Sequence, residues 1–264
     1  MINPQPLRGR RIVVTRHAEG NGRLAARLEE LGAETLELPL IQIESDVDRL
    51  TAGDIFREIG HYEWIVFTSA NGVRYFFETF FEAFEDIRSL GIMRIAAVGE
   101  GTARKIRELH LKVDLIPEEA NGDSLAKALA DEQTLDNLRV LVITGNRNRE
   151  DLVQKLNEER AIVDTFQVYK TELTDLQDHP AAARFRAEGA DALIFASSSA
   201  VKSFGEQAQY LKLASGAKVP QLCSFGPVTS QTMRQAGIPV ALEAEESSLD
   251  GMVQALVEHF TSGN

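Results

Sequence analysis

The feature that most constrains the fold is a match between the two halves of the chain. Ala33 to Glu44 (AETLELPLIQIE) aligns without a gap with Ala161 to Glu172 (AIVDTFQVYKTE), at an offset of 161 − 33 = 128 residues in a chain of 264. The segments RIVVT at 11–15 and RVLVIT at 139–144 keep this offset. A self-match at about half the chain length indicates two copies of one structural unit.

The match continues beyond these segments. IVFTSAN at 65–71 pairs with LIFASSS at 193–199. After a slip of one residue, Val98-Gly99-x-x-Thr102 pairs with Phe225-Gly226-x-x-Thr229. The duplication therefore spans nearly the whole chain.

Short apolar runs alternate with helical patterns throughout both copies. This alternation predicts an α/β fold in which each copy is a flavodoxin-like lobe with a parallel, doubly wound sheet. The runs are apolar at every position, as expected for strands that are covered on both faces. Strands are predicted at 11–15, 35–38, 64–68, 95–98, 113–116 and 139–144, and helices near 21–31, from 71, 101–109, 124–129 and 151–156.

Composition excludes several classes of protein. The net charge of −12 argues against a protein that binds nucleic acid or anionic membranes, which needs a basic surface. No apolar run approaches the roughly 18 residues of a membrane helix, and the first ten residues lack a signal-peptide core, so a cytoplasmic protein is expected. The single cysteine, Cys223, cannot form an intramolecular disulfide and is predicted to be a buried strand residue.

Small polar residues cluster where nearly every predicted strand ends. In an open α/β sheet this edge binds ligands, and the helix that opens at each cluster presents free N–H groups to an anion. Ordinary helix capping explains any single cluster, but their presence in both copies favours a shared binding site. Arginines beyond equivalent strands suit carboxylate recognition, or are solvated loop charges. The candidate binding residues are Arg16, Thr68, Ser69, Gly99, Thr102, Gly145, Arg147, Ser197, Ser198, Gly226 and Thr229.

The sequence lacks the usual signatures of cofactor chemistry. Gly99-Glu100-Gly101 lacks the third glycine of a dinucleotide fingerprint, and no Gly-Lys-Ser/Thr follows Gly145. The histidines have no metal-ligand spacing, so we expect neither cofactor nor metal. Tyr169 is the candidate catalytic residue, because a phenol keeps its proton at neutral pH and can donate to a departing hydroxyl. The alternative is a half-buried tyrosine in a strand.

Five segments together resemble the uroporphyrinogen-III synthase family over residues from about 8 to 260. They are IVFTSANGV at 65–73, VGEGTA at 98–103, VYKT at 168–171, SFGPVTS at 224–230 and AGIP at 236–239. The resemblance implies two lobes joined by a two-stranded connector. One lobe would comprise 1–39 with 173–264 and the other 45–166, with crossings at 40–44 and 167–172. The duplication alone also allows two sequential lobes.

The resemblance also implies a reaction. The family closes the linear tetrapyrrole hydroxymethylbilane to uroporphyrinogen III without a cofactor, losing water and inverting the last ring through a spiro intermediate in the cleft between lobes. The family's tyrosine falls on Tyr169, and its threonines fall on Thr102 and Thr229. Its Ser/Thr pair falls on Thr68 and Ser69, with Ser197 as the counterpart in the other lobe. Many members have proline where this chain has Ser198.

The implied partner is the polycarboxylate bilane, in a monomer that binds neither nucleic acid nor membranes. Direct transfer of the bilane by transient contact with hydroxymethylbilane synthase stays open. Two other classes of function also stay open. One is a two-lobed sensor that closes on an anionic metabolite without a reaction. The other is a nucleotide- or flavin-dependent enzyme on flavodoxin-like lobes.

Overall fold

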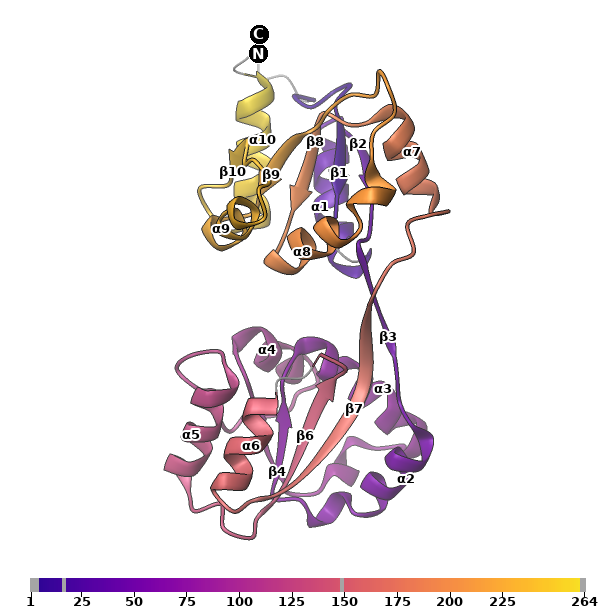
Figure 1. Ribbon diagram of the computed structural model, residues 1–264. Coiled ribbons are helices and arrows are strands. Elements are labelled where there is room, and N and C mark those ends of the chain that lie inside the picture. Colours follow the sequence, from indigo (N-terminus) through magenta and orange to yellow (C-terminus); the bar gives the residue numbers. More distant parts are fainter. Residues whose placement is uncertain (1–4, 16–17, 148–149, 262–264) are drawn as a thin grey trace. The chain divides into compact units, whose positions relative to one another are not determined.

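The computed structural model describes residues 5–15, 18–147 and 150–261. Contacts within the chain divide it into two units, and each is an α/β assembly (Figure 1). Unit 1 comprises Met1–Gln42 with Glu172–Asn264, and unit 2 comprises Ile43–Thr171. The first unit is therefore built from two separate stretches of sequence.

Unit 1 contains a parallel sheet with the strand order β10-β9-β8-β1-β2. Strand β8 lies at its centre and is fully buried, because helices cover both of its faces. The strands are β1 (Arg11–Val14), β2 (Glu34–Glu37), β8 (Ala192–Phe195), β9 (Gln221–Ser224) and β10 (Leu242–Glu243).

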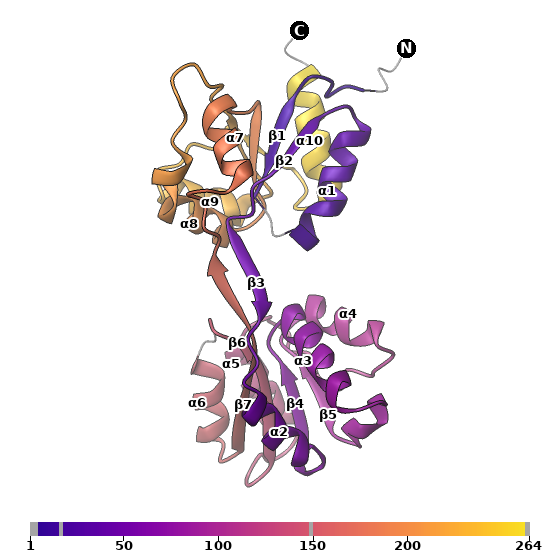
Figure 2. The same cartoon turned by 90° about the vertical axis from the view of Figure 1, so that its right-hand side faces the viewer.

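The two faces of this sheet carry different helices (Figure 2). On one face, Ile12 and Ile194 pack with the apolar sides of α1 (Ala18–Glu30) and α10 (Leu249–Thr261). On the other, Leu193 packs with helical residues that follow later in the chain. These come from α7 (Pro180–Glu188), α8 (Ser198–Glu206), the short 3-10 helix η3 (Ala208–Leu211) and α9 (Pro227–Gln235).

Unit 2 contains a sheet with the order β3-β7-β6-β4-β5, in which β4, β5, β6 and β7 run parallel (Figure 1). Strand β7 is the longest and continues past the end of its neighbour β6. The strands are β3 (Ile41–Ser45), β4 (Trp64–Phe67), β5 (Arg94–Ala97), β6 (Arg139–Gly145) and β7 (Ile162–Leu173).

An aromatic core fills one face of this sheet. Phe56 meets Phe76 and Phe166 edge to face, with ring centroids 6.0 and 5.9 Å apart, an arrangement that aromatic rings favour. This face carries α2 (Arg49–Arg57), α3 (Ala70–Ala83), α4 (Glu100–Glu108), η1 (Ile59–His61) and η2 (Ile87–Leu90). The opposite face carries α5 (Gly122–Glu132) and α6 (Glu150–Glu158).

The duplication is visible in the strand order. The run β9-β8-β1-β2 of unit 1 corresponds to β5-β4-β6-β7 of unit 2. Each unit also has a carboxylate in the equivalent place, at the edge of the sheet where the parallel strands begin. Glu63 accepts a hydrogen bond from the backbone N–H of Arg139 at 2.7 Å, and Asp191 accepts one from Arg11 at 2.9 Å. The predicted fold class, with its two similar doubly wound units, is confirmed.

One predicted strand is wrong. The segment at 113–116 makes a single parallel bridge, between Ala96 and Leu115. Its neighbour Asp114 uses a carboxylate oxygen to accept the N–H of Ile95 at 3.0 Å, and Pro117 has no N–H to extend a ladder. In unit 1 the corresponding segment is β10, which pairs with β9 through Leu242 and Cys223.

Cys223 is buried as predicted, and burial raises the pKa of its thiol to about 12. Its thiol is therefore not ionised near neutral pH. In the described part of the chain, no helix is both long enough and apolar enough to cross a membrane.

Candidate functional site

A cavity of about 290 Å³ opens at the carboxyl ends of the strands of unit 2. Four of the predicted site residues line it: Thr68, Gly145, Arg147 and Tyr169. They follow or belong to β4, β6 and β7, whose carboxyl ends meet at one edge because the strands are parallel. The fold thus brings together residues that are separated by about a hundred positions in the sequence.

A β-bulge decides where Tyr169 points. Thr144 pairs with Gln167, but Gly145 pairs with Tyr169, so Val168 has no opposite residue on β6. Side chains normally alternate between the faces of a strand, which would send Tyr169 to the face of Gln167. The extra residue instead puts Tyr169 beside the same aromatic core that buries Val168.

Gly145 makes room for the tyrosine ring. A Cβ atom at position 145 would lie 2.6 Å from Cε2 and 2.8 Å from Cε1 of Tyr169, closer than side chains can pack. The requirement for glycine here comes from close approach rather than from an unusual backbone angle.

Ser69, just before α3, and Tyr75, within it, contact the phenol of Tyr169. The Tyr169 hydroxyl lies 3.0 Å from Oγ of Ser69, and its ring stacks beside that of Tyr75, with centroids 6.0 Å apart. Ser69 is the N-cap of α3 and accepts the N–H of Gly72 at 2.9 Å. The serine can therefore donate its own proton to the phenol oxygen, which leaves the phenol proton for a ligand.

Thr68 has no free hydroxyl proton to donate to a ligand. Its Oγ1 donates to the carbonyl of Ile143 at 2.9 Å, so the single hydroxyl proton is already used. The oxygen of this half-buried residue can still accept a hydrogen bond from a ligand in the cavity.

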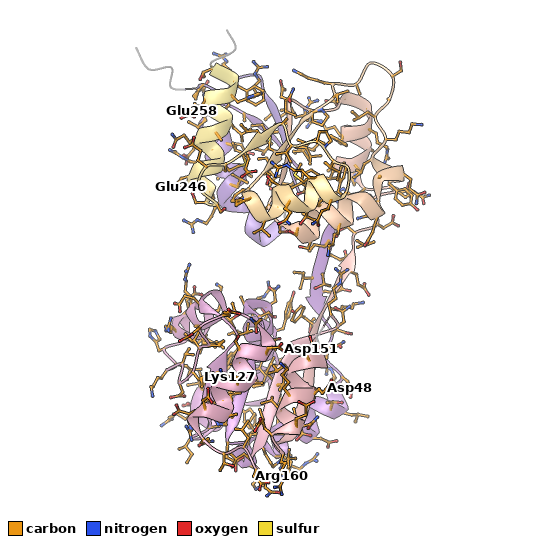
Figure 3. The ribbon with its side chains drawn as sticks, turned by 60° about the vertical axis from the view of Figure 1, so that its left-hand side comes forward. Asp48, Lys127, Asp151, Arg160, Glu246 and Glu258 are labelled. Atoms are coloured by element: carbon orange, nitrogen blue, oxygen red, sulfur yellow. The ribbon has the colours of Figure 1, made fainter. Side chains whose placement is uncertain are left out.

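The positive side of the cavity comes from Arg147 and from helix starts. Arg147 is exposed and lies two residues beyond the end of β6. Asn121 caps α5 by accepting the N–H of Ser124 at 2.8 Å, and it also lines the cavity. In Figure 3, Asp151 in the first turn of α6 lies at this carboxyl edge of unit 2, and Arg160 beyond its end lies at the opposite edge. The free N–H groups at the amino ends of α5 and α6 favour an anion here, and the carboxylates of Asp123 and Asp151 in the first turns of these helices oppose it.

Gly99 and Thr102 lie beside the cavity without lining it. Gly99 is the N-cap of α4, and a Cβ added there would lie 2.9 Å from Cβ of Ala120, which does line the cavity. Thr102 is buried in the first turn of the same helix, where its N–H donates to Gly99. The absence of a side chain at Gly99 therefore allows the close approach of Ala120.

The predicted residues of unit 1 gather at the equivalent strand ends. Ser197 caps α8 and is exposed, and Ser198 donates to the carbonyl of Val228 at 3.5 Å. Gly226 is the N-cap of α9, and Thr229 is buried in its first turn. Arg16, the remaining predicted residue, lies outside the described residues.

Sequence reasoning missed Asn121, Tyr75 and Asn146. The repeat offset of 127 residues could have found the first, because Asn121 corresponds to Ser248, which likewise caps its helix by accepting the N–H of Gly251 at 3.0 Å. Tyr75 and Asn146 carry no such signal, since their contacts depend on the bulge in β7. Among the described residues, no group of three or more His, Cys, Asp or Glu is placed to hold a metal ion.

Two solved structures that share this fold are uroporphyrinogen III synthases. One from Thermus thermophilus, a triple mutant, has a TM-score of 0.63 at 19% identity, over 97% of this chain and 100% of that one. A second, from Helicobacter pylori 26695, has a TM-score of 0.60 at 19% identity, over 95% and 99%. The chain is thus a two-unit α/β protein of the architecture that these synthases share.

Sequence comparison defines the family. A family model described as Uroporphyrinogen-III synthase HemD matches residues 22–254. The uroporphyrinogen-III synthase of Synechococcus elongatus is 29% identical over 96% of both chains. The porphyrin biosynthesis protein HemD of Ruminiclostridium josui is 28% identical over 96% of this chain, which spans 49% of that protein's length. The chain belongs to the uroporphyrinogen-III synthase family, a family of lyases in tetrapyrrole biosynthesis.

Proposed function

We propose that this protein is a uroporphyrinogen-III synthase that converts hydroxymethylbilane to uroporphyrinogen III, with loss of water and inversion of ring D. The observation that carries the proposal is the placement of Tyr169 in a chain of this family. A bulge and a glycine hold its ring at the edge of a cavity, with the hydroxyl 3.0 Å from Ser69.

Tyr169 would assist the loss of the terminal hydroxyl. The pyrrole nitrogen supplies the electron pair as the carbon–oxygen bond breaks, and the phenol donates toward the leaving oxygen, which departs as water. Attack by ring D then gives the spiro intermediate, and ring opening and reclosure invert that ring. The proton released as the macrocycle forms restores the phenol. A positioned donor of this kind contributes typically about 10²–10⁴-fold to the rate.

The substrate's carboxylates would bind donors at the strand ends. Arg147 and the free N–H groups at the start of α5 supply positive potential in unit 2. Thr68 would accept a hydrogen bond from a pyrrole N–H of the bilane rather than bind a carboxylate, since its own proton is bonded to Ile143. The further proposed contacts are Arg16, Ser69, Gly99, Thr102, Gly145, Ser197, Ser198, Gly226 and Thr229.

The remaining features of the proposal follow the family. The protein would work in the cytoplasm as a monomer, without a cofactor. The predicted lobes, 1–39 with 173–264 and 45–166, stay a prediction for the parts that fold as independent bodies, with the crossings at 40–44 and 167–172 between them.

A turnover assay tests the proposal. Hydroxymethylbilane is generated in situ, purified protein is added without cofactor, and disappearance of the bilane is followed against its spontaneous closure. We expect loss of the bilane well above the spontaneous rate. If the protein binds the bilane without accelerating its loss, the two-lobed sensor becomes the better account.

A further inference from the structure

Asn146 holds strand β7 at the place where β6 has ended. Its backbone N–H donates to the carbonyl of Tyr169 at 3.1 Å. Its side chain bonds to Thr171, two residues beyond Tyr169 on β7. Oδ1 accepts the N–H of Thr171 at 2.9 Å, and Nδ2 donates to the carbonyl of Thr171 at 3.3 Å. One residue thereby holds the backbone of β7 at Tyr169 and at Thr171.

The side chain replaces a missing piece of strand. β6 ends at Gly145, and the bulge at Val168 has already broken the regular register. Beyond that point, β7 needs a partner that offers both a donor and an acceptor. The asparagine amide has the same groups as a peptide. Its orientation is fixed, because the N–H of Thr171 needs the amide oxygen as acceptor and the C=O of Thr171 needs the amide N–H as donor.

We propose that Asn146 is a positioning residue that sets the place of the Tyr169 hydroxyl by holding the bulged segment of β7, an inference that rests on the proposed function of Tyr169. Small displacements of a reacting group are costly, since an error of about 1 Å lowers rates by about 100-fold. Asn146 itself needs no contact with the substrate to have this effect.

The test compares Asn146→Ala with Asn157→Ala. Asn157 lies on α6 and lines the same groove as Asn146, one of about 1120 Å³ on the other face of β7. Its exposed side chain makes no hydrogen bond to any described residue. We expect Asn146→Ala to lower kcat by about 10- to 100-fold, with little change in KM, and Asn157→Ala to keep wild-type values.

A double-mutant cycle distinguishes positioning from a general structural effect. If Asn146 acts through the phenol, Asn146→Ala should change kcat less than about twofold in a Tyr169→Phe background, because the group being positioned is gone. An equal fold-loss in both backgrounds overturns the proposal. So does a wild-type kcat for Asn146→Ala.

Amide hydrogen exchange of the peptide that spans β7 provides a readout independent of activity. Asn146→Ala should accelerate exchange at residues 169–171, whereas Asn157→Ala should not. Asn146→Asp, which keeps the acceptor for the Thr171 N–H and loses the donor, should fall between wild type and Asn146→Ala. Unchanged exchange overturns the positioning role even if the wild-type protein proves to have no synthase activity, whereas missing activity with accelerated exchange counts against the proposed function alone.

Discussion

Gly145, the last residue of β6, lies opposite Tyr169 of β7, and the tyrosine ring fills the space that a side chain at position 145 would need. The bulge in β7 turns the ring toward α3. The missing side chain at Gly145 leaves space for the ring, and Oγ of Ser69 forms a hydrogen bond with the hydroxyl. The position of the candidate catalytic group therefore depends on three local features that can each be changed separately.

Gly145→Ala should move the ring and lower turnover. The new methyl group would lie within 2.8 Å of ring atoms of Tyr169, so the ring must shift by a substantial fraction of an ångström. We expect kcat to fall by about 100-fold. The control is Gly53→Ala in α2, where nothing lies within 4 Å of the added carbon. That change should keep full activity and stabilise the helix by about 0.5–1 kcal/mol. Equal activity of the two variants would contradict the close-packing argument.

Tyr169→Phe should remove the donor without disturbing the fold. The ring keeps its packing against Tyr75, and the hydrogen bond to Ser69 is lost. We expect turnover to fall by about 10²–10⁴-fold while circular dichroism and the thermal midpoint change little. Tyr210→Phe, a half-buried tyrosine of unit 1, is the matched control and should retain wild-type turnover. Unchanged turnover in Tyr169→Phe would remove the proposed role.

Ser69→Ala should affect both stability and rate. The variant loses the N-cap of α3, which costs about 1 kcal/mol, and it loses the partner of the phenol. Asp48→Ala removes the cap of α2, where the carboxylate accepts the N–H of Thr51 at 2.8 Å and its hydroxyl at 2.6 Å, and leaves the surroundings of Tyr169 unchanged. We expect similar losses in the free energy of unfolding from both variants, measured with urea. Turnover should fall in Ser69→Ala alone, and a parallel fall in both would attribute the effect to capping.

Asp191 should make unit 1 sensitive to acid. Its burial alone would raise the carboxyl pKa, but Lys218, the backbone N–H of Arg11 and Arg10 together hold it below the ordinary value. The side chain is 6% exposed, and Arg10 lies 3.0 Å away. A lowered folded-state pKa stabilises the fold above the ordinary Asp pKa of about 3.9, and this contribution is lost as the pH falls through the folded-state value.

Asp191→Asn tests this dependence. The variant should be about 1–3 kcal/mol less stable at pH 7 and should lose less stability than wild type on going below pH 4. The readout is the reaction of the buried thiol of Cys223 in unit 1 with a pyridyl disulfide, which still reacts with thiols in acid and reaches this one only when the unit opens. Asp178→Asn, at an exposed position, is the control. Identical acid profiles for wild type and Asp191→Asn would contradict the argument.

The fold could be predicted from sequence because the same pattern occurs twice. A strand assignment at 11–15 supports one at 139–144, and the structure keeps both, as β1 and β6. The segment at 113–116 shows the limit. Its residues are apolar enough for a strand, but the side-chain carboxylate of Asp114 accepts the N–H of Ile95. A local pattern does not record such competition between side chain and backbone.

The site could be predicted only in part for a similar reason. Small polar residues at strand ends identified the edge, and Thr68, Gly145, Arg147 and Tyr169 line one cavity. The direction of Tyr169, however, results from the register between two strands. Alternation along β7 alone assigns it to the wrong face. The role of Asn146 depends on the same bulge, so residue types and spacing do not reveal it.

The most direct test of the synthase assignment is the isomer of the product. Hydroxymethylbilane is generated in situ, the purified protein is added without cofactor, and the oxidised products are separated into type I and type III uroporphyrins. Spontaneous closure gives type I. We predict predominantly type III product, which requires inversion of ring D. Type I alone, from folded protein with Tyr169 intact, would contradict the assignment.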